Sequence, residues 1–302
     1  MIAQSAKKIE KPALNSTQLG NAERQERLAL TLLSLPAILC VIAIIIIPIG
    51  WLFSLSFTGT DGNFSLENYK KMLEYKSYFR VLKTTFNVSF LTTFFCILLG
   101  YPLSYFLSQI PKKYVGIFML TVLLPFWTSL LVRTYAWLVL LQKKGVINNF
   151  AIDMGFWEKP IKLAHNLNGT LIGMIHIMLP FMVLPLYAAM RRVDRQLIQA
   201  SSNLGASPVQ SFWQIFVPLS LPGVIAGSLI VFILCLGFYV TPAVLGGGRV
   251  ILVSMQITAI LEDQFNWGAA SALGVVLLTS TFALLVIVSR FLKIDAIMFG
   301  KS

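Results

Sequence analysis

The chain has 302 residues, enough for one large domain or two small ones. Hydrophobic residues make up 57% of it and charged residues only 12%, whereas a soluble surface needs roughly 25–35% charged side chains. This balance excludes a disordered protein, a disulfide-stapled secreted domain and most soluble enzymes. The net charge of +12 comes from Lys and Arg in short segments between apolar runs. That distribution is typical of residues flanking membrane spans and disfavours a nucleic-acid-binding protein.

Uncharged apolar runs predict an all-α, polytopic membrane protein with six transmembrane helices. About 20 apolar residues cross the hydrocarbon core. The run 42–47 is apolar on every face, unlike the alternating strands of a membrane barrel. Because six is even, both termini share a side, and the Lys and Arg distribution favours N-in and C-in. The predicted spans lie near residues 30–57, 86–108, 115–141, 170–190, 223–245 and 267–290.

The spans divide the chain into a cytoplasmic N-terminal tail at 1–29, a transmembrane domain at 30–292 and a cytoplasmic C-terminal tail at 293–302. The first apolar run follows a polar segment and is far longer than a signal-peptide core, so we interpret it as a retained span. Prolines inside the spans, among them Pro125 and Pro242, predict kinked helices. The three cysteines all lie in apolar runs and are interpreted as small core residues, with no disulfide or metal implied.

The segment between the fourth and fifth spans, residues 191–222, predicts a helix–turn–helix. Asp194 can cap a first helix over 195–204, and Gly205 can end it in the left-handed conformation that disfavours a Cβ. A plain connector between two spans needs only a few residues. The 191–222 loop therefore predicts a docking site for another molecule.

The second helix of this loop has an equally clear start. Ser207 is its cap, Pro208 occupies the first helical position, and Gln210 completes a capping box. Pro218 and Pro222 are predicted to end this helix before the fifth span begins.

Residues 199–207, with the sequence QASSNLGAS, resemble the EAA loop of ABC-importer permeases. The segments 99–102, 124–137 and 241–247 resemble the spermidine/putrescine-type permeases, above all the first of their two permease subunits. The resemblance covers roughly residues 30–292. It implies a type I ABC importer permease fold with the loop in the cytoplasm, and hence the N-in, C-in orientation.

The resemblance also implies partners. A dimer of an ABC ATPase subunit would dock on the loop, a second homologous permease would complete the pathway, and a periplasmic substrate-binding protein would deliver the solute. This chain would be a non-enzymatic subunit in the bacterial inner membrane. It has no complete GxxxxGK[ST] motif, so ATP and Mg²⁺ are expected on the ATPase and no cofactor on this chain. The implied ATPase-coupling residues are Gln199, Ala200, Ser201, Gly205, Ala206, Ser207 and Pro208.

One position departs from the family pattern. The loop of the family usually begins with glutamate, and this chain has Gln199 there. Glutamine keeps an acceptor but loses the charge, so an ion pair with a basic groove residue is absent. Docking is still expected, because Gly205 and the helix caps are intact.

Candidates for the substrate pathway lie in the third and fifth spans. Apart from Arg290 at the last position of the sixth span, Arg133 is the only charged residue inside a predicted span, which makes it a functional candidate. Counted along a straight helix from Lys113 it lies about 30 Å away, near the outer interface, where simple anchoring is the alternative. Aromatic residues there either bind an amine by cation–π contacts or form an interfacial belt. The candidates are Trp127, Arg133, Tyr135, Phe238, Tyr239 and Thr241.

The expected substrate is a small polar solute, with a polyamine such as putrescine or spermidine implied by the resemblance. No predicted span contains a carboxylate, so the second permease would have to supply one. An opine, amino-acid-like or aminophosphonate solute guided by Arg133 stays open within the same class.

Other classes of protein fit less well. A secondary transporter would need inverted repeats or membrane carboxylates, and a membrane enzyme a polar catalytic cluster; the sequence shows neither. His165 and His176 are interpreted as structural histidines, not as metal ligands.

Overall fold

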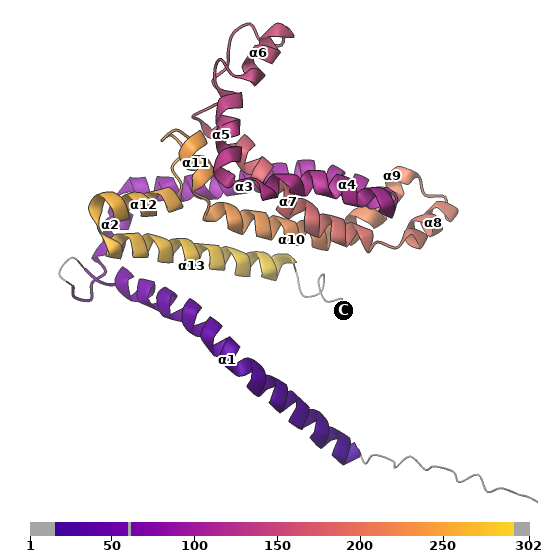
Figure 1. Cartoon of the computed structure of the whole chain (residues 1–302), viewed down its shortest axis with the longest axis horizontal. Coiled ribbons are helices and arrows are strands. Elements are labelled where there is room, and N and C mark those ends of the chain that lie inside the picture. The colour runs from indigo at the N-terminus through magenta and orange to yellow at the C-terminus, as the bar shows by residue number, and fades with distance from the viewer. Residues whose placement is uncertain (1–15, 60–61, 293–302) are drawn as a thin grey trace, which may run out of the picture. The chain divides into compact units, whose positions relative to one another are not determined.

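The computed structural model describes residues 16–59 and 62–292, and the regular elements within them are all helices (Figure 1). The chain divides into two units, residues 1–54 and 55–302. The described part of the first unit belongs entirely to α1 (Ser16–Ser56). This helix starts well ahead of the predicted span, because charged residues limit where a span enters the membrane but are compatible with a helix.

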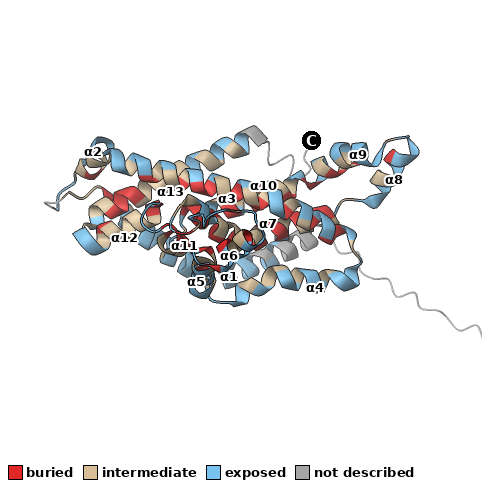
Figure 2. Ribbon diagram, turned by 90° about the horizontal axis from the view of Figure 1, so that it is seen from above, coloured by how far each residue is buried: buried red, intermediate tan, exposed pale blue. Residues whose placement is uncertain are grey.

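Three long helices form the core of the second unit: α3 (Lys76–Gln109), α7 (Leu167–Arg191) and α10 (Val217–Leu236). Buried residues line the sides on which these helices pack together (Figure 2). Met174, Met178 and other α7 residues spaced by four line up along one side of that helix and are buried in the core. The fourth predicted span is confirmed by α7. The second was predicted too short, because α3 carries charged residues in its first turns.

Small residues let α10 approach α7 closely, as the GxxxG spacing predicts. A Cβ on Gly223 would lie 2.5 Å from Cβ of Ala189, and one on Gly227 would lie 2.7 Å from the sulfur of Met182. A side chain at Gly223 would force the helices apart, because its Cβ would also lie 2.9 Å from the Pro185 carbonyl oxygen, and one at Gly227 would displace the Met182 side chain.

The third predicted span is not one straight helix. It consists of α4 (Lys112–Leu123), a short 3₁₀ turn η1 (Leu124–Trp127) and α5 (Leu130–Leu141), which α6 (Val146–Asp153) follows. The segment up to Trp127 and the segment from Leu130 are bent by 95°.

Proline causes the break. Pro125 lies in the 3₁₀ turn, and Thr128, which has an extended backbone, ends that turn. The hydroxyl of Thr128 donates to the Pro125 carbonyl at 2.7 Å. Arg133 lies beyond the bend. The distance counted from Lys113 along a straight helix is therefore wrong.

The fifth predicted span, 223–245, is also wrong at both ends. α10 is helical from Val217 and ends at Leu236, and a separate short helix α11 (Val240–Leu245) follows. Gly237 leaves the helix at the break, where its lack of a Cβ lowers helix propensity. Tyr239 and Thr241 thus lie at the start of α11 and not within a continuous span.

The remaining helices complete the second unit. α2 (Glu67–Glu74) precedes α3, and α12 (Val253–Gln264) packs on α3 and on α13 (Trp267–Leu292). The sixth predicted span is confirmed by α13. Five helices in the described residues are long and apolar enough to cross a membrane, and the bent pair makes a sixth if it is one span.

Candidate functional site

The first helix of the 191–222 loop is α8 (Arg195–Asn203), and both of its ends are as predicted. The Asp194 carboxylate accepts the Gln196 backbone N–H at 2.8 Å. Gly205 has a φ of +86°, and the Ala206 N–H donates to the Ser201 carbonyl at 3.0 Å. This is the left-handed C-terminal turn that glycine makes possible.

The second helix, α9 (Pro208–Ser211), starts with the predicted capping box. The Ser207 N–H donates to the side-chain oxygen of Gln210 at 2.8 Å, and the Gln210 N–H donates to the Ser207 hydroxyl at 3.3 Å. These reciprocal bonds fix the direction in which the chain leaves the turn.

The predicted end of this helix is wrong. A π-helical turn, η2 (Phe212–Phe216), leads from α9 into α10, and the candidate span runs unbroken from Pro208 to Leu236. Pro218 lies in the first turn of α10, directly after the wider π turn, and this irregular turn accommodates the proline without ending the helix. The second helix of the loop is therefore the beginning of a membrane span.

One contact joins the two helices of the loop to each other, and a second set holds the loop to the bundle. The hydroxyls of Ser201 in α8 and Ser211 in α9 lie 2.7 Å apart and are buried. The ring of Tyr105 in α3 meets those of Phe212 and Phe216 edge-on, with centroids 5.3 and 5.0 Å away. The loop, the start of α10 and the end of α3 are thus packed together.

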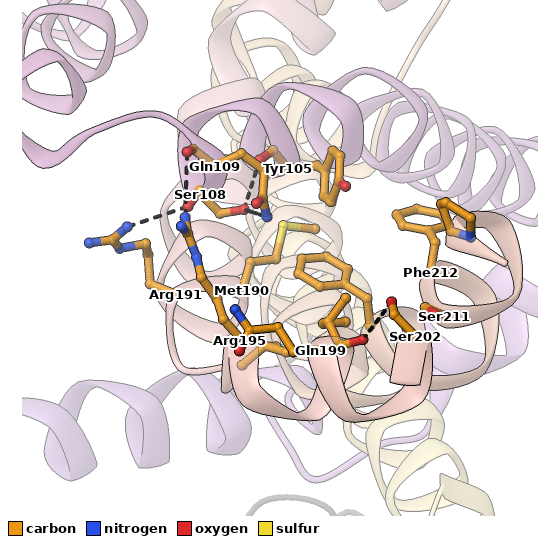
Figure 3. A pocket seen from close by; sticks show the side chains of 14 residues that line it. Tyr105, Ser108, Gln109, Met190, Arg191, Arg195, Gln199, Ser202, Ser211 and Phe212 are labelled. Carbon is orange, nitrogen blue, oxygen red and sulfur yellow. Dashed lines mark hydrogen bonds between the residues drawn. The ribbon is translucent and has the colours of Figure 1, made fainter. Parts of the chain in front are cut away.

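A cavity of about 350 Å³ lies between the loop and the ends of α3 and α7 (Figure 3). Arg191 and Arg195 reach from one side of it to the end of α3. Nη1 of Arg191 donates to the Ser108 carbonyl at 3.3 Å, and Nη2 of Arg195 to the Gln109 carbonyl at 3.4 Å. Cations at a helix C-terminus bind the last carbonyls and offset the dipole. Gln199, the position that departs from the family pattern, lines this cavity.

Apolar side chains at the loop are a feature that the sequence analysis missed. Leu204 is 89% exposed beside the glycine turn, and Val209 and Trp213 are also largely exposed. Exposed apolar clusters of this kind mark interaction surfaces. The sequence contains a signal for this surface, because Leu204 and Val209 lie next to the turn residues Gly205 and Pro208 and have no role in capping a helix.

Four of the six pathway candidates lie on two neighbouring elements. The hydroxyls of Thr134 in α5 and Thr241 in α11 are 3.2 Å apart and fully buried, which joins the two helices. Arg133 and Tyr135 flank Thr134 on α5, and Tyr239 is the N-cap of α11.

The other two candidates belong to neither of these helices. Trp127 ends the 3₁₀ turn on the far side of the bend and is highly exposed. The side chain of Phe238 packs against the core, while its carbonyl accepts the Ser254 hydroxyl at 2.7 Å. The structure thus places four of the six predicted pathway residues on the joined helices α5 and α11.

Arg133 is partly embedded in the protein. Its Nε and Nη1 atoms are buried and have no hydrogen-bond partner among the described residues. Nearby, the Trp137 indole N–H donates to Nδ1 of His176 at 3.1 Å. A hydrogen-bonded side chain within the bundle agrees with the interpretation of His176 as structural.

Several apolar candidate spans around a tightly packed helical core, with a capped helix–turn–helix between two of them, are the architecture of a polytopic membrane protein. Residues 25–293 match the model of the family described as binding-protein-dependent transport system inner membrane component, and the chain belongs to this family.

Similarity to individual proteins supports this membership. The chain is 36% identical to the spermidine/putrescine transport system permease protein PotB of Haemophilus influenzae, over 82% of this chain and 88% of that one. It is 35% identical to the protein of that name from Escherichia coli, over 70% and 77%. The fold matches a chain of a bacterial alginate ABC transporter, solved in complex with an alginate pentasaccharide-bound periplasmic protein, with a TM-score of 0.72 at 15% identity over 93% and 98%. The fold is that of an ABC-importer permease.

Proposed function

We propose that this chain is a permease subunit of an ATP-driven importer in the bacterial inner membrane and forms the pathway for a polyamine, putrescine or spermidine. The observation that carries the proposal is the 36% identity, over 82% of the chain, to a relative named for spermidine and putrescine transport. In this arrangement both termini and the 191–222 loop face the cytoplasm.

The loop is the docking site for a dimer of ABC ATPase subunits, which binds ATP and Mg²⁺. Three features support this role: the capped helices α8 and α9, the exposed apolar Leu204 and Val209 at their junction, and the continuity of α9 with the span α10. A docked ATPase can thereby move a transmembrane helix directly. A second homologous permease and a periplasmic binding protein complete the importer.

Tyr239, Arg133 and Thr241 are the proposed pathway residues of this subunit. The sequence has no carboxylate within its spans, so an aromatic face is the group that can hold an ammonium here, and the second permease supplies the opposite charge. An anionic or zwitterionic solute, such as an opine or an aminophosphonate, would instead be drawn to Arg133.

The test is uptake by the complete importer, reconstituted with its ATPase, second permease and binding protein. We expect ATP-dependent uptake of labelled putrescine or spermidine that an anionic competitor does not reduce. Uptake of an aminophosphonate or opine in place of either polyamine would overturn the polyamine assignment and leave the importer family membership intact.

A further inference from the structure

A second, shallower cavity of about 850 Å³ lies where the α3–α4 connection meets the junction of α7 and α8. Four cationic residues line it: Lys112, Arg191, Arg192 and Arg195. Among the lining residues one is acidic, Asp194, and its carboxylate already accepts the N–H that starts α8. The cavity therefore has a strong excess of positive charge.

The two pairs of cations in this cavity differ in what they contact. Arg191 and Arg195 each donate to a carbonyl at the end of α3 (Figure 3), which fixes their position and leaves further guanidinium N–H groups unused. The side chains of Arg192 and Lys112 are exposed, and within the described residues neither side chain has a hydrogen bond or an ion pair. The cavity is therefore lined by two guanidinium groups held in place by hydrogen bonds and by two cationic groups without a side-chain partner among the described residues.

The level of this cavity along the membrane normal indicates which ligand it binds. The apolar helices α3 and α7 end at Gln109 and Arg191, and α4 begins at Lys112, so the cavity lies at the level where lipid headgroups begin. Basic pockets between transmembrane helices at this level bind anionic headgroups. Guanidinium groups are the side chains that best match phosphate oxygens.

We propose that this cavity is a binding site for the phosphate of an anionic phospholipid headgroup, in the leaflet that faces the 191–222 loop. The inference rests on the membrane placement of the proposed function, and it adds a ligand that neither polyamine transport nor ATPase docking requires. Because Arg195 belongs to α8, the bound headgroup contacts the helix on which the ATPase docks. Anionic lipid would thereby stabilise the position of α8 against α3.

The test uses the purified full-length chain in detergent and native mass spectrometry. The chain is titrated with phosphatidylglycerol or with phosphatidylcholine of the same acyl chains. We expect phosphatidylglycerol to bind more tightly. The double variant Arg192→Gln, Lys112→Gln should weaken its binding by roughly fivefold for each charge removed, without changing the binding of phosphatidylcholine.

The matched control is Lys143→Gln, Lys144→Gln, which removes two exposed lysines between α5 and α6. It should retain phosphatidylglycerol as well as the unchanged chain does. An equal loss in both double variants would show nonspecific surface attraction and overturn the proposal.

A third arm separates lipid from soluble anions. Inorganic phosphate should displace bound phosphatidylglycerol no better than chloride does at the same ionic strength. Specific displacement by phosphate would assign the cavity to a soluble ligand and overturn the lipid source. No arm of this test uses ATP or a polyamine, so its failure is distinct from a failure of the proposed function.

Discussion

Gly205 shows how one residue determines the geometry of a whole surface. Its φ of +86° turns the chain between α8 and α9, and the space beside its Cα is open, since no residue beyond its two chain neighbours comes within 4 Å of the position that a Cβ would occupy. The demand for glycine is therefore conformational and not steric. The left-handed conformation is unfavourable for residues with a Cβ, and most unfavourable for β-branched residues.

Gly205→Val is expected to slow transport while the protein still inserts in the membrane. The left-handed turn would cost roughly 1–2 kcal/mol or distort, and either result misplaces α8 against the ATPase. The measurement is solute uptake and ATP hydrolysis by the reconstituted importer. Gly205→Asn is the matched control, since asparagine tolerates the left-handed region, and it should stay close to the unchanged protein. Normal transport by the valine variant would show that the turn does not position the coupling element.

Tyr239→Ala is expected to weaken polyamine uptake. A desolvated cation–π contact is worth up to about 2 kcal/mol, and Tyr239 is 42% exposed at the start of α11, so the ring face is accessible to an amine. The measurement is the concentration dependence of putrescine uptake. Tyr239→Phe retains the ring and should retain most of the affinity; an equal loss in the phenylalanine variant would point to the hydroxyl instead of the ring.

At the scale of elements, local signals predicted well and tertiary ones did not. The caps at Asp194, Gly205 and Ser207 depend on hydrogen bonds within a few residues, so their sequence pattern is sufficient to predict them. The bend after Pro125 and the continuity through Pro218 have the same local chemistry, a proline in an apolar run, and opposite outcomes. The bend follows a 3₁₀ turn that ends in the extended Thr128, whereas the continuity follows a π turn, and hydropathy measures the length of an apolar run but not which of these turns it contains.

The grouping of the pathway candidates could not be predicted from the sequence either, because it depends on where the helices break and which of them pack together. The sequence placed Tyr239 and Thr241 in a helix that in fact breaks at Gly237. The contact of Thr241 with Thr134 joins positions 107 residues apart in the chain, and no local pattern encodes it. The pathway candidates could be named by residue type, but their grouping required the fold.

The hydroxyl pair between α8 and α9 should be needed for coupling. Ser201→Ala removes the 2.7 Å contact with Ser211, and a hydrogen bond of this kind contributes about 1 kcal/mol. We expect a lower thermal unfolding midpoint and more ATP hydrolysed per solute imported. Ser202→Ala is the control, because both serines donate to the Ile198 carbonyl and only Ser201 also reaches α9. Identical behaviour of the two variants would mean that the link between the helices is not used.

At the scale of the whole molecule, the bent pair α4–α5 sets the topology. If it crosses the membrane, α2 and the α6–α7 connection lie on the same side, and the 191–222 loop lies on the other. If it enters and leaves on one side, α2 and the α6–α7 connection are on opposite sides. The two segments qualify as a span only when taken together, and the 95° bend between them is compatible with either arrangement.

Three cysteine positions distinguish these arrangements, in a background where Cys40, Cys96 and Cys235 are replaced. Glu74→Cys, Lys159→Cys and Ser202→Cys place thiols at exposed residues in α2, in the α6–α7 connection and in α8. We expect a membrane-impermeant maleimide to label the first two in intact cells and Ser202→Cys only in inverted vesicles. Protection of Lys159→Cys in intact cells would show that the bent pair returns to the side it came from. Labelling of Ser202→Cys from outside would place the loop in the periplasm, where no ATPase can dock.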